Sequence, residues 1–403
     1  MQRDLKEALK ELTPLVPPQE IRERAARFQD LMKKGEVEKI LLFHPPDLYY
    51  FTGSTQEGYF FLPAQGEPLY LVQKYAPRAQ VESPWPVVPL KSLKELPAHI
   101  SLDGRVGTEM DLITHNRLQR LSKLFPQVLW QDVSPLIREA KGVKTPWEVE
   151  VLRKAGEIVV RGYIKARGLL KEGMTEMELA ARIFLEMRFL GHEDGESMRS
   201  GRMEGFMGHI LSGYTAAFPS YMNAPLNGVG LSPANPTGPS LKKIQRKETI
   251  VMDFFATHMG YLTDMTRTLC IGQAPSKMRE AHKVLVEVHR FLKENLKPGA
   301  NTLDIYNGVI KIAQDSPFRD CFMGYGDYRV NFIGHGVGIE IDEYPFIARG
   351  LEMELKENMV VAVEPKFLFP GEGAVGLENT YLITPTGTET LTPAPEELWE
   401  KHG

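Results

Sequence analysis

The chain has 403 residues, of which 42% are hydrophobic and 25% are charged, and its formal net charge is −4. This length favours two domains, each able to bury a core, and the weakly negative charge gives no support for a nucleic-acid partner. No apolar run approaches the ~18 residues that indicate a membrane span, and the two cysteines, Cys270 and Cys321, make no disulfide framework. We therefore expect a cytoplasmic protein with no membrane partner.

Residues 1 to about 130 alternate between helix-like and strand-like patterns. Residues 1–12 predict a charged amphipathic helix and not a secretory signal. The elements that follow are predicted as helices over 18–34 and 112–125 and strands over 38–43, 58–63, 68–72 and 128–130. This alternation is typical of a small α/β domain, which we set at residues 1–135. We find no catalytic set in it, and its aromatic side chains are expected in the core.

A second domain, residues 136–403, is predicted to begin after a linking segment at 132–144. Thr145 is the expected N-cap of its first helix, with Pro146 in the first turn and an acid at Glu148. The helices of this domain are predicted over 146–170, 176–189, 276–296 and 303–314.

Two carboxylates lie within the most strand-like stretch of the chain. Residues 249–256 and 261–271 predict two strands joined by a tight turn. The first strand is apolar apart from Asp253, and the second carries Asp264. An isolated carboxylate is costly to bury in an apolar strand, and two carboxylates on paired strands repel each other. A cation between them would resolve both problems, which predicts a metal site with further ligands elsewhere.

Three more residues with metal-binding side chains stand alone in apolar or glycine-rich segments. His335 is flanked by glycines, Glu364 follows the apolar run VVAV, and Glu378 lies in another predicted strand. Two aspartates, one histidine and two glutamates form a set that suits Mn, Co, Zn or Fe, and five ligands suit two ions better than one. We therefore predict a centre of two divalent metal ions.

The order of these five residues resembles that of the pita-bread metallopeptidases, which include methionine aminopeptidase, aminopeptidase P and prolidase. The segments GYLTDMTRT and GHGVGIE are similar to two of the family's metal motifs. The segment DLYYFTG, residues 47–53, resembles an amino-domain motif in which an aromatic strand runs into a Thr-Gly turn. The resemblance covers the whole chain and favours the aminopeptidase P and prolidase branch. It implies an α+β protein, with a pita-bread catalytic domain, a smaller creatinase-type α/β amino-terminal domain, and assembly as a homodimer.

The resemblance also implies hydrolysis of peptide bonds, with Xaa-Pro peptides as the expected substrates. In the leading hypothesis Asp253 chelates one ion, Asp264 and Glu378 bridge both ions, and His335 and Glu364 hold the other. The ions lower the pKa of a bridging water and polarise the scissile carbonyl. Glu364 is the catalytic candidate that carries the proton from this water to the leaving amine.

Three positions depart from the family pattern. The family's Pro-His is Pro219-Ser220 here, within the glycine-rich stretch 205–232, and its His-Glu-x-Pro begins with Asp342. The arginine that the family carries two residues before its last glutamate is Gly376. Serine donates a hydrogen bond but carries no charge, and aspartate places a negative charge where the family has a donor. Ser220 and Asp342 are therefore candidate substrate-binding residues whose chemistry differs from that of the family.

Two histidines near the predicted site segments are alternative sources of the missing imidazole. These are His209, which we include among the candidate substrate contacts, and His258. Such histidines are more often ordinary surface or core residues.

Two other functions are weighed against peptide hydrolysis. The chain could be a catalytically weak or inactive metal-binding protein that serves as a binding module, or it could act on another small amide. The changed substrate contacts favour these alternatives. An intact bridging set favours hydrolysis, because a binding role does not need two carboxylates that share a water. Peptide hydrolysis is therefore the first hypothesis.

Overall fold

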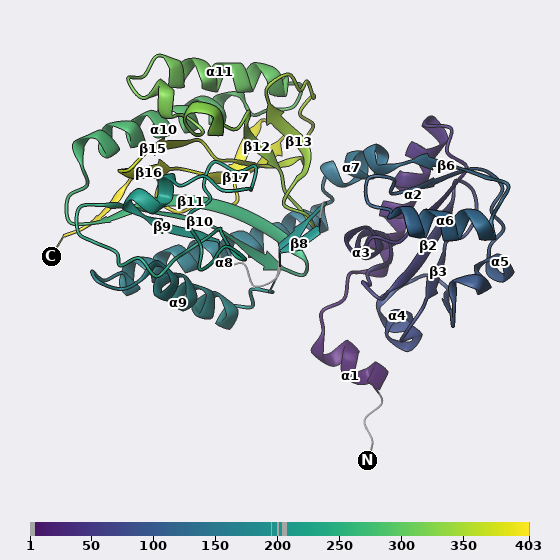
Figure 1. The fold of residues 1–403 in the computed structure, drawn as a ribbon. Helices are drawn as coiled ribbons and strands as arrows, with labels where there is room; N and C mark the ends of the chain where they lie inside the picture. Colours follow the sequence, from purple (N-terminus) through teal and green to yellow (C-terminus); the bar gives the residue numbers. More distant parts are fainter. Residues whose placement is uncertain (1–4, 195, 200, 204–207, 403) are drawn as a thin grey trace. The chain divides into compact units, whose positions relative to one another are not determined.

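The computed structural model describes residues 5–194, 196–199, 201–203 and 208–402 (Figure 1). The chain divides into two compact units between Lys141 and Gly142. This division falls within the last turn of helix α7 (Ser134–Gly142), a few residues after the predicted boundary at 135/136. Among the described residues, no helix is both long enough and apolar enough to cross a membrane.

The first unit is built on a six-stranded sheet in the order β4-β3-β2-β1-β5-β6. Its strands are β1 (Lys39–Leu42), β2 (Gly58–Pro63), β3 (Leu69–Val72), β4 (Val87–Pro89), β5 (Gly104–Thr108) and β6 (Val128–Asp132). Its remaining helices are α1 (Leu5–Leu12), α2 (Pro18–Lys34), α3 (Pro45–Thr52), α4 (Ala76–Glu82), η1 (Leu93–Glu95), α5 (Leu96–His99) and α6 (His115–Leu124). Strand β1 runs antiparallel to β2 and parallel to β5, so the sheet is mixed.

The segment DLYYFTG does not form the aromatic strand that its resemblance suggested. It lies in helix α3, which begins with Pro45 and Pro46 in its first turn. Proline is favoured at this point because its fixed φ suits the helix and its missing N–H has no partner to lose. Gly53 ends the helix at φ +75, and its backbone N–H donates to the Tyr49 carbonyl. The Thr-Gly pair is therefore a helix end, and from this helix the Phe51 ring stacks on Phe60 of β2.

The second unit contains two larger sheets and two helix pairs. The sheets have the strand orders β19-β11-β10-β9 and β13-β12-β14-β17-β18. The first comprises β9 (His209–Ser212), β10 (Thr249–His258), β11 (Tyr261–Ile271) and β19 (Trp399–Lys401). The second comprises β12 (Phe332–Gly336), β13 (Glu343–Ala348), β14 (Val360–Val363), β17 (Asn379–Thr384) and β18 (Gly387–Thr390). Two short pairs complete the strands: β15 (Lys366–Phe369) with β16 (Gly373–Gly376), and β7 (Glu196–Met198) with β8 (Gly201–Met203).

The helix pairs enclose these strands from two sides (Figure 1). The pairs are α8 (Pro146–Leu169) with α9 (Glu176–Phe189), and α10 (Ser276–Asn295) with α11 (Thr302–Gln314); short 3-10 turns lie at η2 (Gly213–Ala217), η3 (Arg319–Cys321) and η4 (Gly326–Tyr328). One buried cluster joins α8 and α9 to β10 and β11, and another joins α10 and α11 to β12, β14 and β15. The strands between the pairs therefore have apolar surroundings, in which isolated polar side chains stand out.

Helix α8 begins as the sequence predicts. The Thr145 hydroxyl accepts a hydrogen bond from the Glu148 backbone N–H at 3.1 Å, and the Glu148 carboxylate accepts one from the Thr145 N–H at 2.8 Å. This reciprocal pair satisfies two backbone donors that a helix start otherwise leaves free.

The glycine-rich stretch predicted at 205–232 lies partly outside the described residues, which resume at 208. Its described part contains β9 and η2 and then an irregular segment. The buried carboxylate of Glu176 anchors this segment, since it accepts hydrogen bonds from the backbone N–H groups of Ser212 and Ser240 at 2.7 and 3.0 Å.

Candidate metal centre

Strands β10 and β11 place the two predicted aspartates on one face of their sheet. The antiparallel register pairs Asp253 with Thr266, and Asp264 lies two residues before Thr266. Because side chains two residues apart share a face, the two carboxylates are diagonal neighbours. Both side chains are only partly buried, as expected of groups at a site.

The second sheet brings the other three predicted ligands to the same place. His335 lies on β12, which pairs with β14. Val363 of β14 and Asn379 of β17 are cross-strand partners. Glu364 is the residue after Val363, and Glu378 is the residue before Asn379, so both glutamates lie at the same end of this strand pair. The Glu378 backbone N–H donates to the Thr266 carbonyl at 3.1 Å, which joins this sheet to β11. All five predicted ligands therefore come from strands, or strand ends, of two joined sheets.

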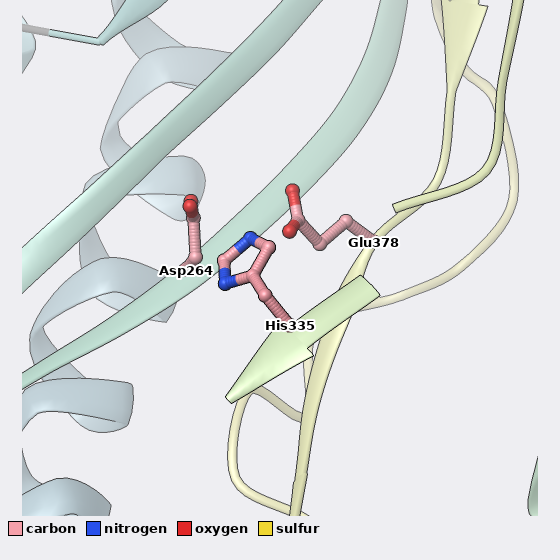
Figure 2. A group of neighbouring side chains, drawn as sticks. All are labelled: Asp264, His335 and Glu378. Carbon is pink, nitrogen blue, oxygen red and sulfur yellow. The ribbon is translucent and has the colours of Figure 1, made fainter. Parts of the chain in front are cut away.

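Three of the five side chains are arranged to hold one cation. Asp264, His335 and Glu378 each offer a ligand atom, and these atoms all lie within 4.8 Å of one another. Figure 2 shows the three side chains converging from separate strands. The Oε1 atom of Glu378 is buried and has no hydrogen-bond partner among the described residues, while its Oε2 accepts from the Thr266 hydroxyl at 2.6 Å. A buried carboxylate oxygen without a partner is costly, so a metal ligand role suits it.

His335 is oriented by its neighbours. Its Nδ1 lies 3.3 Å from the Gly336 carbonyl, and its Nε2 lies 3.4 Å from Glu364 Oε1. If Nδ1 carries the proton, Nε2 is free to bind an ion, which is the usual division of roles in a ligating histidine.

A lysine that the sequence prediction did not include lies among these ligands. Lys366, the first residue of β15, is fully buried. Its Nζ lies 2.5 Å from Glu364 Oε2, 3.4 Å from Asp253 Oδ2 and 3.6 Å from Glu378 Oε2. One ammonium group therefore contacts three of the four predicted carboxylate ligands.

The cluster shifts the pKa values of its members in opposite directions. Burial would raise the pKa of Glu364, but the charge of Lys366 and the hydrogen bond from His335 lower it to about 2. Burial and the neighbouring carboxylates raise the pKa of Glu378 to about 8, although Lys366 opposes the shift. Burial would lower the pKa of Lys366, but Asp253 and the two glutamates outweigh this effect and raise it. The lysine is thus held as an ammonium ion, and Glu364 as its carboxylate partner.

Comparison with known proteins identifies the family. The sequence signature of Metallopeptidase family M24 matches residues 150–385, and that of the Creatinase/Prolidase N-terminal domain matches residues 24–142. The chain belongs to metallopeptidase family M24. The family depends on divalent metal ions, in agreement with the cluster of Asp264, His335 and Glu378.

Individual relatives match nearly the whole chain. The Xaa-Pro dipeptidase of Pyrococcus furiosus is 28% identical over 380 residues, which cover 94% of this chain and 100% of the relative. The solved prolidase of Pyrococcus horikoshii OT3 superimposes with a TM-score of 0.80 at 26% identity, covering 93% of this chain and 99% of the other. Aminopeptidase P from E. coli shares the fold, with a TM-score of 0.73 at 19% identity over 95% of this chain and 97% of the other. These structures confirm the predicted pita-bread fold with an amino-terminal domain.

The predicted substrate-binding residues of this M24 protein lie in different surroundings. His209 is the cross-strand partner of Asp253 and is buried, and this burial lowers the pKa of its imidazole. Ser220 lines a cavity of about 240 Å³, which none of the five predicted ligands lines, and its hydroxyl donates to the Pro236 carbonyl at 3.0 Å. Asp342 accepts a hydrogen bond from the Arg199 backbone N–H at 2.9 Å. Of the three, His209 lies beside the predicted ligands.

Lys366 is the residue of this cluster that the sequence prediction missed. The sequence does contain a signal for it, because a lysine opens the otherwise apolar run KFLF directly after Glu364-Pro365. A lysine in a buried strand needs a carboxylate partner. That rule would have directed attention to the cluster, although only the fold shows which carboxylates it meets.

Proposed function

We propose that this chain is a metal-dependent peptidase that hydrolyses Xaa-Pro peptides, in the manner of the relatives named Xaa-Pro dipeptidase and prolidase. The observation that carries the proposal is the convergence of Asp264, His335 and Glu378, with an unpartnered buried oxygen on Glu378. A site that held no metal ion would give no reason to keep such an oxygen unsatisfied inside a protein.

A divalent ion at Asp264, His335 and Glu378 would lower the pKa of a water molecule and polarise the scissile carbonyl. Glu364 is the proposed proton carrier, because the Oε1 atom of its carboxylate lies 3.4 Å from His335 Nε2, beside the group that would hold the ion. Lys366 fixes this carboxylate by a contact of 2.5 Å. The fixed orientation keeps Oε1, and not Oε2, on the His335 side of the cluster.

Several finer predictions go with this proposal. A second ion at Asp253, substrate contacts from Ser220, Asp342 and His209, a homodimer and a cytoplasmic location stay predictions. The identity of the ion also stays a prediction, since carboxylates with one imidazole suit Mn, Co, Zn or Fe.

The test is metal-dependent release of products from Xaa-Pro dipeptides and longer Xaa-Pro peptides. Metal-stripped protein is reloaded with Mn, Co or Zn and compared with D264N and E364Q, which keep the size of each side chain but remove its charge. We expect turnover in the reloaded chain and its loss in both variants. The preference for short or long peptides then distinguishes dipeptidase from aminopeptidase action. E357Q, the same change at an exposed glutamate, is the matched control and should keep the activity.

A reloaded chain that binds metal but shows no turnover above D264N and E364Q would overturn the proposal. The remaining readings would then be a metal-bearing binding module or a hydrolase of another small amide. Neither is favoured by a specific contact in the structure.

A further inference from the structure

We propose that the ammonium group of Lys366 takes the place of one of the two predicted metal ions, so that the chain binds a single divalent ion at Asp264, His335 and Glu378. This inference deepens the proposed function and rests on it for the metal dependence of the site. It concerns how many ions the site holds, and it therefore has a test that does not require catalysis.

The ammonium group of Lys366 lies among carboxylates that the two-ion hypothesis assigns to both ions. In the two-ion hypothesis Asp253 chelates one ion, Glu364 holds the other, and Glu378 bridges both. Lys366 Nζ lies between 2.5 and 3.6 Å from an oxygen of each of these residues. Divalent ions bind carboxylate oxygens at about 2.0–2.2 Å. An ion held by Asp253 and shared with Glu378 would need the space beside these two oxygens that the ammonium group occupies, and its charge would repel that group.

The two carboxylate oxygens of Glu378 have different surroundings. The Glu378 oxygen nearest to the lysine is Oε2, which also accepts a hydrogen bond from the Thr266 hydroxyl. Glu378 Oε1 is the buried oxygen without a hydrogen-bond partner in the described structure. It belongs to the carboxylate that faces Asp264 and His335 (Figure 2). One side of the cluster is therefore neutralised by the protein itself, while the other side is left for an ion.

The opposite strand provides the space for the lysine. Lys366 and Gly376 are direct cross-strand partners in the β15–β16 pair. A Cβ atom at Gly376 would lie 3.1 Å from Lys366 Cγ and 2.7 Å from Thr266 Cγ2. The absence of a side chain at residue 376 thus allows the lysine stem to reach the carboxylates. Gly376 is also the position at which the resembled family carries arginine, so this chain has a glycine where that cation would be and a lysine across from it.

One other role for Lys366 is consistent with its place. It could replace the family's arginine as an outer cation while two ions remain bound. That role predicts two ions per chain, and the ion count therefore separates the two roles.

The experiment counts ions in the intact chain. Protein stripped with a chelator is reloaded with excess Mn(II), freed of unbound metal by gel filtration, and assayed for Mn per chain by mass spectrometry. The electron paramagnetic resonance spectrum of the same sample shows whether the Mn(II) ions are isolated or coupled as a close pair. For the wild type we expect one ion per chain and the spectrum of an isolated ion.

Variants test whether Lys366 is the cause. K366A removes both charge and stem, and should raise the count to two ions per chain with the spectrum of a coupled pair. K366R keeps the charge and should stay at one. K144A is the matched control, because Lys144 is also buried and contacts a carboxylate, that of Glu343, which is not a predicted ligand. It should leave the count at one.

Each outcome supports or overturns the inference. Two ions, or none, in the wild type overturns it, and so does a K366A variant that folds and still binds one. If K366A folds only when Mn(II) is present, the count is made on the metal-refolded protein, and two ions support the inference. If K366A does not fold at all, the wild-type count and spectrum decide alone. Failure of the proposed peptidase activity would leave these counts unchanged, so the two failures are distinguishable.

Discussion

A buried glutamate in the first unit should make its stability depend on pH. Glu109 is fully buried, and its Oε1 accepts hydrogen bonds from the backbone N–H groups of Phe43 and His44 at 3.0 and 3.1 Å. Burial and the nearby charge of Asp47 raise its pKa from 4.5 to about 7. The folded state thus holds a proton that the unfolded chain releases more readily. The stabilisation is present below about pH 4.5 and is lost as the pH rises through about 7.

The size of this effect follows from the two pKa values. One pKa unit corresponds to about 1.4 kcal/mol, so the wild type should lose roughly 2.5 kcal/mol of stability between pH 5 and pH 8 through this group. E109Q cannot ionise, and its amide oxygen can still accept from Phe43 and His44. Its Nε2 can donate to the Thr108 hydroxyl, which lies 3.2 Å from the native Oε2. The variant should therefore be close to the wild type at pH 5 and more stable than it at pH 8.

Hydrogen exchange read by mass spectrometry is the suitable assay, because it reports on each unit separately. Peptides from β1 and β5 should show higher protection in E109Q than in the wild type at pH 8, and equal protection at pH 5 after correction for intrinsic exchange. Peptides from β17 in the second unit are the internal control. E38Q, the same change at an exposed position, should follow the wild type at both pH values. Equal pH dependence in E109Q and the wild type would refute the reasoning.

Three further predictions concern the second unit. Burial lowers the pKa values of His192, His282 and His289 to about 4. Stability that is present above pH 6.5 should therefore be lost as the pH falls through about 4. Acid unfolding, measured by circular dichroism, should be less steep in H192Q than in the wild type. T145A removes the N-cap acceptor of α8 and should cost about 1 kcal/mol in urea unfolding, whereas T145S should cost much less. The Arg267 guanidinium donates hydrogen bonds to the backbone carbonyls of Pro395, Glu378 and Ala394. R267M leaves these buried carbonyls without their donor and should cost about 3 kcal/mol or more in urea unfolding. A loss below about 1 kcal/mol would contradict the importance of these hydrogen bonds for stability.

The candidate metal ligands could be proposed from the sequence because each is an exception to its surroundings. Asp253 and Asp264 interrupt apolar strands, and His335, Glu364 and Glu378 do the same elsewhere. Burial of an ionised group is so unfavourable that such exceptions need a partner. The sequence therefore predicts that these residues meet a cation. It does not state whether the cation is a metal ion or a side chain, and Lys366 shows that both must be considered.

Cross-strand register explains what was missed. Lys366 meets Asp253 and Glu378 because β15 pairs with β16, and β16 lies against β10 and β11. Such contacts join residues far apart in the chain, and single-sequence patterns carry no information about them. The resemblance also misled at 47–53, where it implied an aromatic strand. There the prolines that begin α3 and the glycine that ends it outweighed the aromatic preference for strands.

The facing pair of Lys366 and Gly376 constrains the order in which this site can change by mutation. A side chain at 376 would crowd the lysine stem, since its first carbon would lie 3.1 Å from Lys366 Cγ and the stem would have to move by a few tenths of an ångström. Shortening residue 366 first removes that obstacle, leaving Thr266, whose Cγ2 would be 2.7 Å away, to rotate or shift. The same two substitutions thus have different costs according to which comes first.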